Sequence, residues 1–246
     1  MATLPVERTT FEQILEAYLL QFVDSGGGTG GTILPTRLEI INAIKAKIDE
    51  LIPEGEGVQF TLASVPNISN PYDIFINTIL DEVAKELLLI APLHVLVPTV
   101  PDPMLVGTQL TTDEWGKTGY VTLPDDFLRL QAFQMTEWER PVSVPITTLD
   151  SLYPMQKNKF VRGGVAKPVA VLAFLGAVKV LEYYSVQTAH TVLIFRYIPL
   201  LLPENIQSNL FDSLTWLGAS KVLQIIGSPL SKAAYDQTIL SFKDMQ

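Results

Sequence analysis

The chain has 246 residues, of which 48% are hydrophobic and 17% charged, and its formal net charge is −9. It contains no cysteine, which excludes disulfides, thiolate metal sites and cysteine nucleophiles. The 17 basic residues are scattered rather than gathered into the patch that supplies most of the affinity in proteins that grip nucleic acid. We therefore expect no tight nucleic-acid binding, although DNA could pass an acidic surface without adhering.

The apolar residues are in surplus, because about 25% charged residues is usual for a soluble domain. The longest nearly charge-free stretches, such as residues 166–177, are interrupted by Lys, Pro or Gly before the roughly 20 residues that span a bilayer. The N-terminus MATLPVERTTFEQ lacks the basic region and apolar run of a signal peptide. We predict no membrane helix, and burial of the apolar surplus between subunits of an oligomer.

Helical periodicity dominates the first 92 residues. Apolar residues recur at three- and four-residue spacing over residues 9–24, 35–53 and 70–92, with Thr, Pro and Asn near the predicted starts. Between the first two helices lies GGGTGG, the glycine loop, whose backbone entropy excludes it from regular structure. We expect a flexible contact loop there, comprising Gly26, Gly27, Gly28, Gly30 and Gly31.

From Leu93 the chain changes to short runs rich in Val, Ile, Tyr and Phe, separated by Pro, Gly or Asp. This pattern favours an antiparallel sheet or small barrel. The predicted strands cover residues 120–123, 127–138, 142–146, 169–174, 177–184 and 191–197, with a short helix over 148–157 and a turn at 162–164.

Helical periodicity returns after Pro199, with one helix from Pro203 to Gly227 and a last helix from Ser228 to about Asp244. The predicted class is α+β: a helical bundle of N- and C-terminal helices, with an inserted small antiparallel sheet or barrel. The expected divisions are residues 1–92, 93–199 and 200–246, the last packing back on the first because both have apolar faces to cover.

No motif in the sequence indicates an enzyme. His94 and His190 stand outside any metal-ligand spacing, and the glycine loop follows a helix and lacks the Lys-Ser or Lys-Thr of a phosphate loop. Adjacent carboxylates, as at Asp125 and Asp126, point to opposite sides of an extended segment, so they cannot easily flank one bond. We predict no catalytic residue, no cofactor and no metal.

The most informative segment is YVTLPDDFLRL, residues 120–130. Its proline ends a strand by removing a backbone donor, and its two aspartates favour a turn. The phenylalanine that follows is expected to be buried, and the arginine to point outward or toward a neighbouring carboxylate. A tryptophan further on is expected to pack in the core or fill an interface. The predicted structural corner or interface comprises Leu123, Pro124, Asp125, Asp126, Phe127, Arg129 and Trp138.

The longer segment YVTLPDDFLRLQAF, residues 120–133, resembles a pattern of the head-to-tail connector proteins of tailed phages. In that pattern a strand ending in Leu-Pro is followed by Asp-Phe-Leu-Arg and a second strand. The order of KPV, LEYY and IFRYIP before a closing pair of helices agrees with that family's layout. The likeness spans residues 93–245 and is nearest to tail tubular A-like adaptors and the ring proteins of short-tailed, crAss-like phages.

The resemblance implies a structural virion protein of the neck or tail, assembled in the host cytoplasm, whose copies form a closed ring that is twelve-fold in that family. The implied partners are the portal or a neighbouring ring protein and tail proteins, with DNA passing the lumen without specific binding. Some adaptors carry a long C-terminal extension, whereas this sequence ends directly after its predicted last helix. We therefore expect outside contacts from the glycine loop or from a second loop over residues 98–117.

Two other classes remain open. One is a soluble small-ligand-binding domain or an enzyme of unknown class that uses the β-rich part as a pocket, which would require convergent polar groups. The other is a scaffold subunit of a non-viral assembly.

Overall fold

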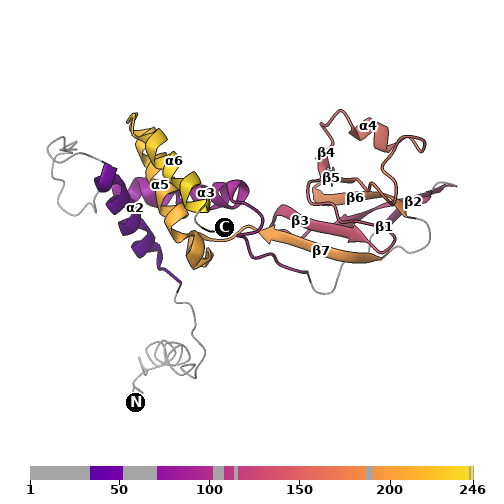
Figure 1. Ribbon diagram of the computed structural model, residues 1–246, viewed down its shortest axis with the longest axis horizontal. Coiled ribbons are helices and arrows are strands. Elements are labelled where there is room, and N and C mark those ends of the chain that lie inside the picture. Colours follow the sequence, from indigo (N-terminus) through magenta and orange to yellow (C-terminus); the bar gives the residue numbers. More distant parts are fainter. Residues whose placement is uncertain are drawn as a thin grey trace, which may run out of the picture. The chain divides into compact units, whose positions relative to one another are not determined.

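The computed structural model describes residues 34–51, 71–101, 108–113, 116–186, 191–243 and 245 (Figure 1). The chain divides into residues 1–33 and residues 34–246, and the description below concerns the second unit alone. The predicted helix over residues 9–24, the glycine loop, Trp115 and His190 lie outside the described residues.

The helical part contains α2 (Arg37–Leu51), α3 (Pro71–Ile90), α5 (Phe211–Ile225) and α6 (Ser231–Lys243). A capping box opens α2: the Thr36 amide donates to Glu39 Oε2 at 2.7 Å, and the Glu39 amide donates to Thr36 Oγ1 at 3.3 Å. These bonds to Thr36, first its amide and then its hydroxyl, hold the pKa of Glu39 below its ordinary value. Pro71 occupies the first position of α3, where a missing amide donor costs nothing.

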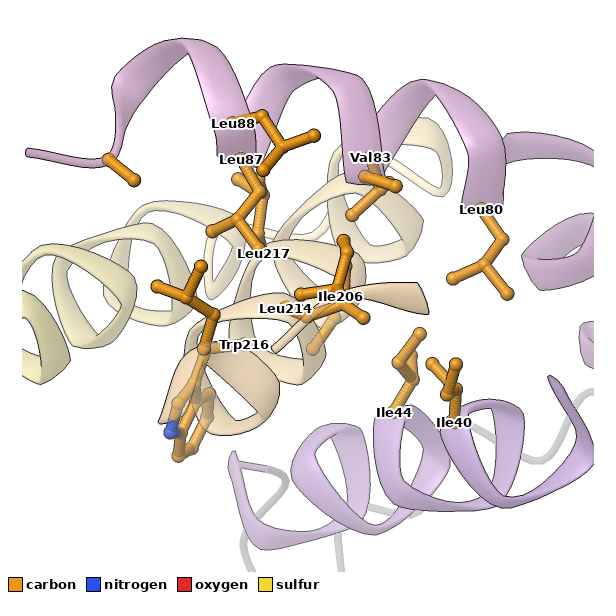
Figure 2. Close-up of a cluster of buried hydrophobic side chains, with 14 of the residues drawn as sticks. Ile40, Ile44, Leu80, Val83, Leu87, Leu88, Ile206, Leu214, Trp216 and Leu217 are labelled. Atoms are coloured by element: carbon orange, nitrogen blue, oxygen red, sulfur yellow. The ribbon is translucent and has the colours of Figure 1, made fainter. Parts of the chain in front are cut away.

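The helical core lies where α2 and α3 pack against α5. In Figure 2, Ile40 and Ile44 of α2 and Leu80, Val83 and Leu87 of α3 approach the α5 helix from opposite sides. The α5 helix is buried over residues 213–220, so apolar or small residues line all its faces rather than one stripe. A Cβ atom at Gly218 would come within 2.5 Å of Ile44 Cδ1, so glycine permits the close approach of α2.

The C-terminal helix begins later than its sequence pattern predicts. Residues 203–210 form two short 3-10 turns, η1 (Pro203–Asn205) and η2 (Ser208–Leu210), before α5 starts at Phe211. Ile206 and Gln207 between the turns are extended, with ψ of 138° and 143°. This conformation delivers Ile206 to the helical core, where it is buried, so tertiary packing overrides local helix propensity.

The β-rich part has a five-stranded sheet in the order β1-β2-β6-β5-β4 and a separate two-stranded sheet, β3-β7. The strands of the first sheet are β1 (Thr108–Asp113), β2 (Gly116–Thr122), β4 (Ile146–Thr147), β5 (Ala170–Leu175) and β6 (Val178–Val186). The second pairs β3 (Phe127–Met135) with β7 (Val192–Pro199). All pairings are antiparallel except β4 with β5.

A second hydrophobic core lies among these strands. It joins Phe133 of β3 and Phe195 of β7, whose rings meet edge to face at 6.0 Å, to Leu181 and Tyr183 of β6. Two residues of the β3-β7 sheet face the other way, since Ile198 belongs to the helical core and Leu128 packs against it. The two-stranded sheet therefore serves both cores.

These elements confirm the α+β class, although the strands form two separate sheets rather than a closed barrel among the described residues. Two local predictions are wrong. Residues 98–117 include β1 and the start of β2 instead of a plain loop. Residues 142–146 form only one isolated bridge and the start of β4, because Pro141 and Pro145 lack amide donors.

Candidate functional site

The predicted corner is a tight turn between β2 and β3. The Phe127 amide donates to the Pro124 carbonyl at 3.0 Å, which places Asp125 and Asp126 at the two central positions of the turn. Leu123 and Phe127 on either side are buried, whereas the two aspartates are exposed. The turn that the proline and the two aspartates predict is therefore present, and this backbone hydrogen bond closes it.

Asp126 ties the corner to β7. Its carbonyl accepts the Leu200 amide at 2.7 Å, and its carboxylate Oδ1 accepts the Tyr197 hydroxyl at 2.9 Å. The Tyr197 ring stacks on Phe127 with ring centres 5.7 Å apart. Burial, and then the hydrogen bond to the carboxylate, raise the pKa of Tyr197 to about 12, so the hydroxyl remains a donor to Asp126 above the pH near 10 at which an ordinary tyrosine titrates.

Arg129 ties the corner to the helical part. Its Nη1 donates to the carbonyl oxygens of Leu89 at 3.0 Å and Ala91 at 2.7 Å, at the C-terminal end of α3. A helix leaves its last four carbonyls without intrahelical partners, and a cation there also interacts favourably with the helix dipole. Gln131 adds a longer bond from Nε2 to the Leu93 carbonyl at 3.4 Å. The corner therefore joins the two cores.

Two titratable residues outside the corner, Glu139 and His94, are exposed. The Glu139 amide donates to the Val165 carbonyl at 3.1 Å. Within the described ranges, no three His, Cys, Asp or Glu side chains gather closely enough to hold a metal ion.

Trp138 lies inside the β-rich core rather than on the surface. Its side chain is buried, its indole nitrogen donates to the Tyr184 carbonyl at 3.2 Å, and its ring meets Phe133 edge to face at 5.6 Å. Both the indole N–H and the ring of this tryptophan thus have partners within one chain. Of the two roles that its sequence leaves open, the core role fits its position.

A shallow cavity of about 360 Å³ lies among α3, α5 and α6. Three of its polar side chains already have partners: Lys221 Nζ pairs with Glu86 Oε2 at 2.7 Å, and Ser220 Oγ donates to the Ser231 carbonyl at 2.8 Å. Ligand sites present polar groups free to converge on a ligand, and these three are committed to internal contacts, so this cavity makes a poor candidate.

The segment between β4 and β5, residues 148–169, is called the arch. A short helix is present there, as predicted over residues 148–157 although over fewer residues, whereas the contacts that hold the segment in place are not predicted by the sequence. The arch contains the short helix α4 (Tyr153–Gln156) and returns toward β6 (Figure 1). There Ser185 Oγ donates to the Gly163 carbonyl at 2.6 Å and accepts a hydrogen bond from Arg162 Nε at 3.2 Å, and we call this set of contacts the clamp. The buried Gln156 side chain accepts the Gly163 amide at 2.9 Å. In the sequence, the only sign of this clamp is the presence of the polar residues Gln156, Arg162 and Ser185.

The clamp includes backbone strain. Ser185 has φ of 59°, in the left-handed region that non-glycine residues rarely adopt. A Cβ atom at Gly163 would come within 2.7 Å of Val169 Cγ2, so the other half of the clamp requires glycine. Such strain persists only where the surrounding contacts over-determine it. The arch is therefore a fixed part of the fold.

A scan against protein-family models and a search of curated proteins both find no match to this chain. No helix in the described part of the chain combines the length and apolar character needed to cross a bilayer. The corner joins two cores, and the Asp126 and Arg129 side chains in it bind within the chain. The arch, in contrast, presents large apolar side chains to solvent.

Proposed function

We propose that the chain is a structural virion protein, one subunit of the head-to-tail connector ring that joins portal to tail in a tailed phage. The resemblance of residues 93–245 to connector proteins supports the class. The observation that carries the proposal is the ordered arch, on which Leu149 is 95% and Phe160 72% exposed. Isolated exposed apolar residues are ordinary, but large ones held on a clamped segment are typical of protein interfaces.

The balance of composition supports an assembly role. A chain with 17% charged residues has apolar area left over after its two cores are filled, and burial between subunits accounts for it. In a ring, each subunit contacts the next through two different surfaces, and closure is set by the angle between them. The net charge of −9 is compatible with DNA passing a lumen without binding to it.

The partners in this proposal are further copies of the chain, the portal or a neighbouring ring, and tail proteins. Its location is the virion neck, after assembly in the host cytoplasm. No cofactor or metal takes part, and the action is mechanical: the ring seals a joint and leaves a passage for the genome.

Mass photometry of the purified chain, alone and mixed with the portal and tail proteins of the same virion, tests the proposal. We expect a discrete large oligomer, visible as a ring by negative-stain electron microscopy. A chain that stays monomeric in every mixture, or that converts a small molecule as a monomer, contradicts it.

A further inference from the structure

The five-stranded sheet has a second buried face, which belongs to neither hydrophobic core. Side chains alternate along a strand, so Leu181 of β6 points into the β-rich core and Val180 points to the opposite face. The register of β5 with β6 sets Ala173 opposite Val180 and Val171 opposite Glu182, so these side chains share that face. Val171, Ala173 and Val180 are each at most 3% exposed, yet none of them is part of the two cores. We call this surface the second face.

The arch meets the sheet on the second face. In Figure 1 the arch with α4 lies on one side of β5 and β6, and β3 and β7 lie on the other. Tyr184 of β6 also points to the second face, where its hydroxyl donates to Glu182 Oε2 at 2.6 Å. Burial, and then that hydrogen bond, raise the pKa of Tyr184, and the nearby Tyr153 and Arg162 of the arch also affect it. The clamp attaches at Ser185, the next residue.

The arch turns its polar side to the sheet and its apolar side to solvent. Leu149 and Phe160 are exposed, whereas Gln156 is only 5% exposed and Arg162 bonds to Ser185. A segment that covers apolar side chains usually does so with apolar side chains of its own, because their burial supplies the free energy that holds it there. The attachment of the arch therefore depends more on the hydrogen bonds of the clamp than on buried apolar area.

The clamp is attached where β6 is distorted. Tyr184 and Ser185 stand opposite the single residue Thr118 of β2, which makes a β-bulge. Ser185 has φ of 59° there, a conformation that is disfavoured for any residue with a Cβ atom. Its hydroxyl oxygen bonds both Gly163 and Arg162, so one atom links the strained backbone to the arch. Release of the arch removes the contacts that keep Ser185 in this conformation.

We infer that the arch is a strap with a held and a released state. In the held state, which is the one described above, the clamp closes the arch over the second face and keeps Ser185 left-handed. In the released state Ser185 returns to the extended region and the second face is open to solvent. The strap thus controls which apolar surface the chain offers to a partner: the outer side of the arch when held, and the second face when released.

The first test detects exposure of the second face by thiol labelling, and the absence of native cysteine removes any background. In Val180→Cys the thiol should react with a maleimide whenever the arch is released, whereas in Leu181→Cys it faces the β-rich core and should react only through global unfolding. Urea unfolding of each variant gives the labelling rate that global unfolding alone would produce. Val180→Cys should exceed its own rate by at least tenfold, and Leu181→Cys should match its own.

A matching rate at both positions overturns the strap, because the second face would then open only when the whole chain unfolds. Ala173→Cys, on the facing strand, is a second probe of the same face and replaces Val180→Cys if that variant does not fold.

The second test asks whether the strain at Ser185 is coupled to release. Ser185→Ala and Ser185→Gly both remove the hydroxyl, but glycine adopts a left-handed backbone without steric cost and alanine does not. Alanine should therefore favour the released state more than glycine does. In the Val180→Cys background, labelling should be about tenfold faster with Ser185→Ala than with Ser185→Gly. Equal rates in these two variants contradict the coupling and with it the inference.

The strap is a property of the single chain, so its tests are separate from that of the connector function. Labelling is measured at concentrations at which mass photometry shows monomers. A chain that forms no ring refutes the connector function and leaves the labelling result unchanged. A ring that forms normally from a chain whose Val180→Cys variant labels only through global unfolding refutes the strap alone.

Discussion

Replacing Arg129 by methionine tests whether the corner couples the two hydrophobic cores. Methionine keeps an unbranched apolar stem of similar length but removes both donors to the end of α3. Hydrogen bonds from a charged donor contribute about 1.5–3 kcal/mol each, but the bond to Leu89 is exposed to water, which can replace it. We therefore expect a loss of about 2 kcal/mol in the free energy of unfolding, mostly from the bond to Ala91.

Two tryptophans allow each core to be observed separately. Trp138 belongs to the β-rich core and Trp216 to the helical core. In one background Trp115 and Trp216 are replaced by phenylalanine, and in the other Trp115 and Trp138, so that urea unfolding followed by fluorescence reports one core at a time. Arg129→Met should lower the midpoint by about 1 M in both backgrounds, given urea slopes of about 1–3 kcal/mol/M.

The matched control is Arg196→Met, because Arg196 is an exposed arginine on β7 of the same two-stranded sheet. It should change neither midpoint by more than a few tenths of 1 M. Equal shifts from both arginine variants would refute the reasoning. A shift seen by Trp138 and not by Trp216 would show that Arg129 acts within the β-rich core alone, which contradicts the coupling.

Three further predictions concern particular contacts. Gly218→Ala should destabilise the helical core by up to about 2 kcal/mol, since overpacking against Ile44 costs about 1–3 kcal/mol and the higher helix propensity of alanine stabilises by about 1 kcal/mol. In the double variant with Ile44→Val, the loss measured by thermal unfolding should be smaller than the sum of the two single losses. The pKa of Tyr197 is raised to about 12 in the folded chain, whereas an unfolded tyrosine titrates near 10, so its contribution to the free energy of unfolding is complete below pH 10 and falls as the pH rises toward 12. The free energy of unfolding of Tyr197→Phe should therefore fall by about 2–3 kcal/mol less over that range than that of the unmodified chain, measured by urea unfolding at each pH. Ser185→Ala keeps the strained backbone but leaves the Gly163 carbonyl without its donor, so hydrogen exchange in residues 156–164 should accelerate at least fivefold, whereas unchanged exchange would show that the serine does not hold the arch.

The sequence predicts the local parts of this fold well. The bounds of α2 and α3 follow from apolar periodicity closed by proline, and the turn at residues 124–127 follows from proline and aspartate chemistry. Each of these signals acts over a few neighbouring residues, so no knowledge of the rest of the chain is needed.

The parts that escape prediction depend on distant partners. The carbonyls that Arg129 binds lie 38 and 40 residues earlier in the chain, and nothing near Arg129 indicates them. The left-handed backbone at Ser185 is equally hidden, because the residue type gives no reason to expect it. Trp138 could be read as core or interface until the Tyr184 carbonyl and the Phe133 ring fixed its place.

The corner and the arch should separate stability from assembly. The polar groups of the corner bind within the chain, Asp126 to Tyr197 and Arg129 to the end of α3, so they are committed to internal contacts and poorly placed to bind a neighbour. Changes there should lower the free energy of unfolding and affect assembly only through it. The exposed side chains of the arch contribute little to folding, so changes at Leu149 or Phe160 should weaken assembly at constant stability. A corner variant that weakened assembly while keeping full stability would reverse these roles and place the subunit contact at the junction of the two cores.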